Sequence, residues 1–195
     1  MAHLSPKKGG FPFKDHHDRT CPIAYSSINA IERGTAICVD SDTGYFRVAT
    51  VDDAGKRPIY LSLQDGHDLQ SAMAGFFSVA KGDGNLKTTP GSRTRHNEAG
   101  HSAANVRAPA ITGILLEGDT WQLDTFDETK EGYKQNAYLT LDAYGRFVPT
   151  VDATKAVAYC VCDGPYSRYV NDHVPSGMED LMTGGMTKVI DIQGK

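Results

Sequence analysis

The sequence predicts a mainly β protein, namely an antiparallel β-barrel or sandwich built from two similar halves. Short segments in which apolar and polar residues alternate at period two indicate half-buried strands. Residues 34–66 and 136–164 also show one order of features twice: strand, glycine turn, Phe, Val-Asp, strand and Asp-Gly. One β domain is therefore expected over residues 31–195, with one amphipathic helix, an extended N-terminal arm and a long loop insert.

The overall composition excludes several classes of protein. A net charge of −4 gives no general indication of nucleic-acid binding. No apolar run reaches the about 18 residues that a membrane span requires. The N-terminus carries charges but no apolar core, so we expect no secretory signal and a chain made in the cytosol.

Residues 1–30 are predicted to form the extended arm. Prolines and glycines interrupt any helix there, and no periodicity persists. Phe11 and Phe13 flank Pro12, so the arm carries apolar groups as well as charge. Residues 1–22 have a net charge of +2, from Lys7, Lys8, Lys14 and Arg19 against Asp15 and Asp18.

The repeat begins with a strand and a tight turn in each copy. In the first copy Ile37 and Val39 alternate with Ala36 and Cys38. In the second copy Leu139 and Leu141 alternate with Tyr138 and Thr140. The strands end in the acidic glycine turns DSDTG and DAYG, where glycine supplies the positive φ of a hairpin. The segments 31–66 and 110–165 are therefore expected to be the two β halves.

Three pieces complete the predicted domain. Residues 67–81 have apolar residues at helical spacing and predict an amphipathic helix that covers the core. Residues 82–109 form a long polar loop insert. Within it, residues 82–108 have a net charge of +2, from Lys87, Arg93, Arg95 and Arg107 against Asp83 and Glu98, which leaves −8 for the body. Residues 111–127 predict a hairpin, and residues 166–195 a tail with a last strand around Ile190.

No motif predicts catalysis, a cofactor or a metal site. In HNEAGH the histidines His96 and His101 are five residues apart, with Asn97 where a zinc protease has glutamate. Cys160 and Cys162 lack the Cys-x-x-Cys spacing of zinc sites and are interpreted as small apolar residues on one strand face. No phosphate loop or nucleophile elbow is present.

The segment GDTWQLDTFDETKEGYKQNAYLTLDAYGRFVPTVDATKAVAYCVCDGP, residues 118–165, resembles tailed-bacteriophage capsid decoration (cement) and related virion structural proteins. In that group a strand enters an Asp/Thr-rich loop, Gly-Tyr follows, and a Gly or Asn turn leads into Leu-Thr. GTAICVDSDTGYF, residues 34–46, is similar to the opening strand pair of the same proteins. The resemblance covers under half of the chain, and the arm and the basic insert are departures from it.

The resemblance implies a β-barrel or β-tulip body that binds the outer surface of a capsid in the virion. Such proteins form homotrimers or dimers at symmetry axes and cover seams between major capsid subunits, without a catalytic site. The arm and the insert suit contacts with capsid subunits or sister protomers, because polar segments can become ordered on a neighbour. The expected partner-binding residues are Lys7, Lys8, Phe11, Phe13, Lys14, Arg93, Arg95 and Arg107.

Two other classes remain open at this stage. One is a head-fibre or receptor- or glycan-binding β-sandwich, in which Trp121 and the nine tyrosines form a stacking platform. The other is a small β-barrel enzyme whose site combines distant carboxylates and histidines.

Overall fold

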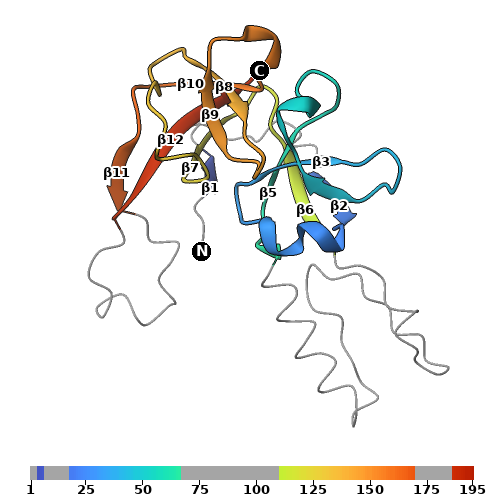
Figure 1. Cartoon of the computed structure of the whole chain (residues 1–195). Helices are drawn as coiled ribbons and strands as arrows, with labels where there is room; N and C mark the ends of the chain where they lie inside the picture. Colours follow the sequence, from blue (N-terminus) through green and yellow to red (C-terminus); the bar gives the residue numbers. More distant parts are fainter. Residues whose placement is uncertain (1–3, 7–17, 67–109, 170–185) are drawn as a thin grey trace, which may run out of the picture.

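The computed structural model of the chain describes residues 4–6, 18–66, 110–169 and 186–195 (Figure 1). Within these residues the protein is mainly β, and every pair of neighbouring strands is antiparallel. Three short 3-10 turns lie between the strands of the described residues: η1 Tyr25–Ala30, η2 Val51–Asp53 and η4 Ala153–Lys155. The helix expected at 67–81 and the loop expected at 82–109 lie outside the described residues.

The strands form two sheets, which Figure 1 shows side by side. The first sheet has five strands in the order β2-β6-β5-β3-β4. They are β2 Asp18–Pro22, β3 Ala36–Val39, β4 Phe46–Val48, β5 Tyr60–Ser62 and β6 Ala110–Leu115.

The second sheet has seven strands in the order β1-β7-β12-β10-β8-β9, with β11 also paired to β12. They are β1 Leu4–Pro6, β7 Thr120–Leu123, β8 Tyr138–Leu141, β9 Phe147–Thr150, β10 Ala158–Cys160, β11 Tyr166–Tyr169 and β12 Met186–Gly194. The predicted last strand around Ile190 is confirmed as β12, whereas β11 was not predicted.

Neither sheet is closed into a barrel, which corrects the barrel prediction. In the first sheet a single isolated bridge joins Ile23, just beyond β2, to Phe46 in β4. In the second sheet a single bridge joins Phe126, beyond β7, to Phe147 in β9. A barrel requires a continuous hydrogen-bonded ladder around its circumference, so two packed sheets describe the fold.

The two sheets share the larger hydrophobic core. It combines Ala36 and Leu61 of the first sheet with Leu139, Phe147 and other buried side chains of the second. A smaller core lies on the other face of the first sheet and contains Cys21, Ile23, Ile31, Ile37, Phe46, Tyr60 and Ile111. The first sheet is therefore buried on both faces.

This double burial changes the interpretation of β3. The sequence predicted a half-buried strand with Ile37 facing inward, but Ala36 and Cys38 are also fully buried. Ile37 belongs to the smaller core, while Ala36 and Cys38 face the second sheet in the larger core. In the second sheet β8 keeps the predicted alternation at its start, because Leu139 is buried and Tyr138 is partly exposed.

The two predicted glycine turns are confirmed. Gly44 connects β3 to β4 with a φ of 69°, and Gly145 connects β8 to β9 with a φ of 72°. A side chain at Gly145 would place its Cβ 2.7 Å from the Ala36 carbonyl oxygen, because this turn packs on the first sheet. Glycine is thus required at Gly145 by the close approach as well as by the turn.

The predicted hairpin at 111–127 is wrong. β6 pairs with β2 and β5 of the first sheet, whereas β7 pairs with β1 and β12 of the second. The Glu117-Gly118-Asp119 turn is therefore the crossover between the sheets. It contacts the end of β12, where the Gly194 amide donates to the Asp119 carbonyl at 3.0 Å.

Within the expected N-terminal arm, β1 and β2 belong to the two sheets and residues 25–30 form the turn η1. β1 pairs with β7, and Leu4 is only 3% exposed. β2 pairs with β6, and Ile23 is fully buried. Apolar residues of the segment 1–30 are thus anchored in the body, while residues 7–17 lie outside the described part.

Candidate functional site

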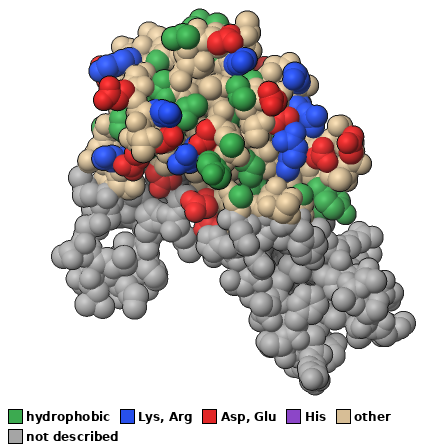
Figure 2. Space-filling model, in the orientation of Figure 1, with side chains coloured by type: hydrophobic (Ala, Val, Ile, Leu, Met, Phe, Trp, Pro, Cys, Tyr) green, Lys and Arg blue, Asp and Glu red, His purple; other side chains and the backbone are tan. Residues whose placement is uncertain are grey.

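All eight predicted partner-binding residues lie outside the described residues. Five are in the segment 7–17 and three in the segment 67–109. Candidate surfaces must therefore come from the body. On the face shown in Figure 2, acidic and basic side chains are interspersed and do not form one large charged patch.

A groove lies where the two sheets meet. Its volume is about 210 Å³, which suits one or two side chains or a small molecule. Aliphatic groups and three charged side chains surround it; the lining residues are Gly55, Arg57, Pro58, Ile59, Leu115, Leu116, Glu117, Thr154, Ala156, Val157 and Lys195. Both cations are already engaged: the Lys195 ammonium donates to the Ala153 carbonyl at 2.6 Å, and Arg57 donates to the Val39 carbonyl at 3.1 Å.

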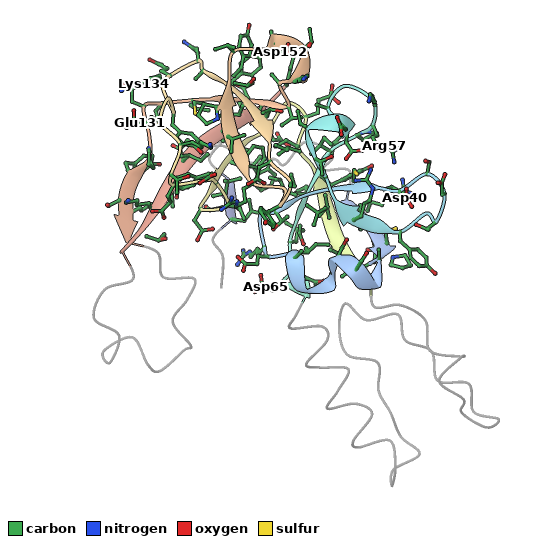
Figure 3. The ribbon with its side chains drawn as sticks, viewed as in Figure 1. Asp40, Arg57, Asp65, Glu131, Lys134 and Asp152 are labelled. Carbon is green, nitrogen blue, oxygen red and sulfur yellow. The ribbon has the colours of Figure 1, made fainter. Side chains whose placement is uncertain are left out.

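Beside this groove, a buried carboxylate organises the connection from β4 to β5. Asp53 is 4% exposed and accepts a bidentate pair from Arg47, at 2.9 and 2.7 Å. Arg57 adds a contact of 3.3 Å, and Asp40 lies 4.0 Å from Arg57 (Figure 3). Burial acts to raise the pKa of Asp53, but the hydrogen bonds from Arg47 and Thr50 outweigh it and hold the pKa below its usual value. This cluster shapes one wall of the groove.

A second polar network lies on the outer face of the second sheet. Gln122 is fully buried and donates to the Tyr166 hydroxyl and to Asp191, the latter at 3.0 Å. Tyr166 in turn donates to Asp191 at 2.7 Å, and Arg168 donates to the Gln122 amide oxygen. Burial and the bond to Asp191 raise the pKa of Tyr166, so its hydroxyl stays a donor. The network fastens β11 to β7 and β12.

The cysteines are free thiols in different environments. Cys38 and Cys160 are buried, and burial raises their pKa values to about 11 and about 12. β10 ends at Cys160, so Cys162 lies beyond the strand, where its thiol is 3.7 Å from Asp191. Among the described residues, no group of three His, Cys, Asp or Glu side chains is placed to hold a metal ion.

The aromatic residues are distributed differently from the predicted stacking platform. Trp121 is 3% exposed and lies in the shared core, as does Tyr133 at 1%. Tyr138 and Tyr159 are partly exposed on neighbouring strands, with ring centroids 5.4 Å apart and planes at 46°. Trp121 therefore cannot bind a ligand at the surface, whereas Tyr138 and Tyr159 form a partly exposed aromatic pair on the second sheet. The sequence analysis did not single out this pair. Each tyrosine is adjacent in the strand to a buried residue, Leu139 or Ala158, and must therefore point to the opposite face.

Comparison with known proteins finds no matching family model, no similar curated protein and no similar solved structure. In the part of the chain that the structure describes, no helix is long and apolar enough to cross a bilayer.

Proposed function

We propose that the protein is a non-enzymatic capsid decoration (cement) protein that binds the outer surface of a phage head. Its partner is the major capsid protein, and it stabilises contacts between capsid subunits as a homotrimer or a dimer. The observation that carries the proposal is the strand pattern of residues 118–165, which resembles such proteins. In the structure this segment supplies β7, β8, β9 and β10 of one sheet.

The distribution of charge supports this function. The described residues carry twelve Lys and Arg side chains against seventeen Asp and Glu, a net charge of −5. The segments 7–17 and 67–109 each carry +2. An acidic body with two basic segments can bind acidic subunits through those segments while the body stays in solvent. Many copies on one lattice also make individually modest contacts strong together.

We further infer that the body consists of two similar halves, with boundaries near 18–115 and 120–194. The strand orders β2-β6-β5-β3-β4 and β7-β12-β10-β8-β9 follow the same connectivity. Phe46 lies opposite Val39 just as Phe147 lies opposite Leu141. The segments 67–109 and 170–185 also occupy corresponding places in the chain: the first lies between β5 and β6, and the second lies between β10 and β12.

Core packing supports the inference of two similar halves, because a large and a small side chain have changed places between corresponding strands. The pair registers make Tyr60 the counterpart of Ala158, and Gly113 the counterpart of Ile192. The first half thus combines a large residue on β5 with glycine on β6, and the second combines alanine on β10 with isoleucine on β12. Such a swap keeps the summed core volume similar, as expected for two copies that diverged under the same packing constraint.

Co-sedimentation with phage heads that lack the protein tests the function. Wild-type protein should bind at a fixed ratio to the major capsid protein and saturate. Because β1 and β2 are parts of the sheets, the arm is tested by changing Lys7, Lys8, Phe11, Phe13 and Lys14 to Ser rather than by deletion. Lys130→Ser and Lys155→Ser together provide a control at exposed lysines of the body. Absence of saturable binding by the wild type refutes the proposal.

The alternatives have less support. Burial of Trp121 removes the predicted centre of a glycan platform. The tyrosine pair remains available to a head-fibre or glycan-binding module, and screening of soluble glycans tests that function. A small β-barrel enzyme lacks support from a specific arrangement of side chains in the described residues.

A further inference from the structure

A row of uncharged side chains crosses the outer face of the second sheet. The strand registers place five residues side by side in this row; they are Thr120, Gln193, Tyr159, Tyr138 and Thr150, and we call it the tyrosine face. Residues next to them along the strands, such as Leu139, Ala158 and Ile192, are fully buried in the shared core. Because successive side chains of a strand point to opposite faces, the row points away from that core.

The centre of the row has the features of a protein-binding surface. Tyr138 and Tyr159 are cross-strand partners with contacting rings, and both are partly exposed. No hydrogen bond to either hydroxyl group occurs in the described part of the protein. Tyrosine supplies a large contact area with little loss of side-chain entropy and is enriched at interface centres.

The corresponding face of the first half is buried within this chain. The counterparts of Tyr138, Tyr159, Gln193 and Thr150 are Ala36, Leu61, Ile114 and Ala49, respectively. These four residues are buried in the core that the second sheet shares. The same face of the repeated unit is thus covered, in the first half, by another unit of this chain.

The charge pattern indicates that a second copy covers the tyrosine face. Two identical acidic bodies repel each other, and this repulsion is smallest where an uncharged face of one copy meets the same uncharged face of the other. The tyrosine face contains no charge, whereas the described body as a whole carries −5. The charged residues two positions from the row along the chain are engaged: Asp191 accepts from Tyr166, Asp152 accepts from Thr154, and Lys195 donates to Ala153.

We propose that two copies of the protein form a dimer through the tyrosine face. The uncharged side chains of the row allow the two rows to pack on each other, with the tyrosine pairs at the centre. The proposal concerns the isolated protein and does not depend on binding to phage heads.

The mass in solution, measured by sedimentation equilibrium from roughly 10 μM to 1 mM, tests the proposal. Wild-type protein should show a reversible dimer of twice the 21.1 kDa chain mass. Tyr159→Glu and, separately, Gln193→Glu introduce a charge into the row and should each weaken dimerisation at least about 30-fold. Tyr144→Glu is the matched control, because Tyr144 is 66% exposed on the β8–β9 turn outside the row, and it should dimerise like the wild type.

Circular dichroism establishes that each variant is folded before its mass is interpreted. A monomeric wild type over the whole range overturns the proposal, as does a dimer or trimer that persists unchanged in both charged variants. Monomeric wild-type protein that binds cellohexaose or chitohexaose with NMR shifts at Tyr138 and Tyr159 also overturns it, and assigns the face to carbohydrate.

Discussion

Exchange of one residue pair between the halves tests whether they are copies of one packing unit. The first half contains Tyr60 beside Gly113, where the second contains Ala158 beside Ile192. The double variant Tyr60→Ala/Gly113→Ile installs the second arrangement in the first half.

Each single change should be costly for a different reason. Tyr60 is 9% exposed and packs edge-to-face on Phe46 with centroids 5.6 Å apart, so Tyr60→Ala should cost roughly 3–5 kcal/mol. A Cβ at Gly113 would lie 3.0 Å from the Phe46 ring and 3.2 Å from Ile37, so Gly113→Ile overpacks the core and should cost about 3 kcal/mol.

The double variant should be more stable than the sum of the single effects by at least about 2 kcal/mol. Removal of the Tyr60 ring gives the Phe46 ring room to move away from the new isoleucine side chain. Urea unfolding followed by circular dichroism gives the three free energies. Tyr60→Ala combined with Gly118→Ala is the control, because Gly118 has open space around it and should combine additively. Additivity within about 0.5 kcal/mol for the exchanged pair refutes the reasoning.

Two further predictions concern single sites. Gly194→Ala should lower the free energy of unfolding by about 3 kcal/mol or more, since its Cβ would overlap the Leu116 carbonyl group. Gly118→Ala, strained only by a φ of 78°, should cost about 1–2 kcal/mol in the same urea assay. Asp53→Asn should cost about 2–3 kcal/mol at pH 7, because Arg47 loses its carboxylate partner. Folding lowers the pKa of Asp53, so its stabilisation is present above the ordinary pKa of an aspartate, about 4, and is lost as the pH falls below that value. Stability measured from pH 6 to pH 2 should therefore fall less in the variant; equal acid sensitivity contradicts this role.

The hairpins could be predicted from sequence because their determinants are local. Alternation around Leu139 and the glycines at 44 and 145 specify strand, turn and return strand within a dozen residues. The partner of β6 could not be found in this way. Ile114 and Trp121 are separated by a short acidic glycine turn, which has the composition of a hairpin but connects two sheets. β6 pairs with β5 across the segment 67–109, and a pairing between strands so far apart in the chain leaves no local pattern in the sequence.

The surface residues show a second limit of sequence reasoning. The glycan-binding alternative placed Trp121 in a surface platform by residue type, although its alternation with Gln122 places it with the inward-facing Leu123. The same two-residue alternation places Tyr138 and Tyr159 on the face opposite the buried residues, so the tyrosine face could have been predicted from the alternation alone. Burial of Ala36 and Cys38 could not, because it results from the packing of one sheet on another.

The two corresponding faces differ in composition because one is always covered within the chain and the other is exposed in the monomer. A face that another part of the same chain always covers can become fully aliphatic, as Ala36, Leu61 and Ile114 are, because it never meets water in the folded protein. The outer face of the second sheet is exposed whenever the protein is monomeric, and an aliphatic surface there would promote aggregation. Tyrosine, threonine and glutamine tolerate water and still supply contact area. The composition of the tyrosine face is therefore that of a surface that is reversibly covered, which is why a concentration-dependent mass is the decisive observation.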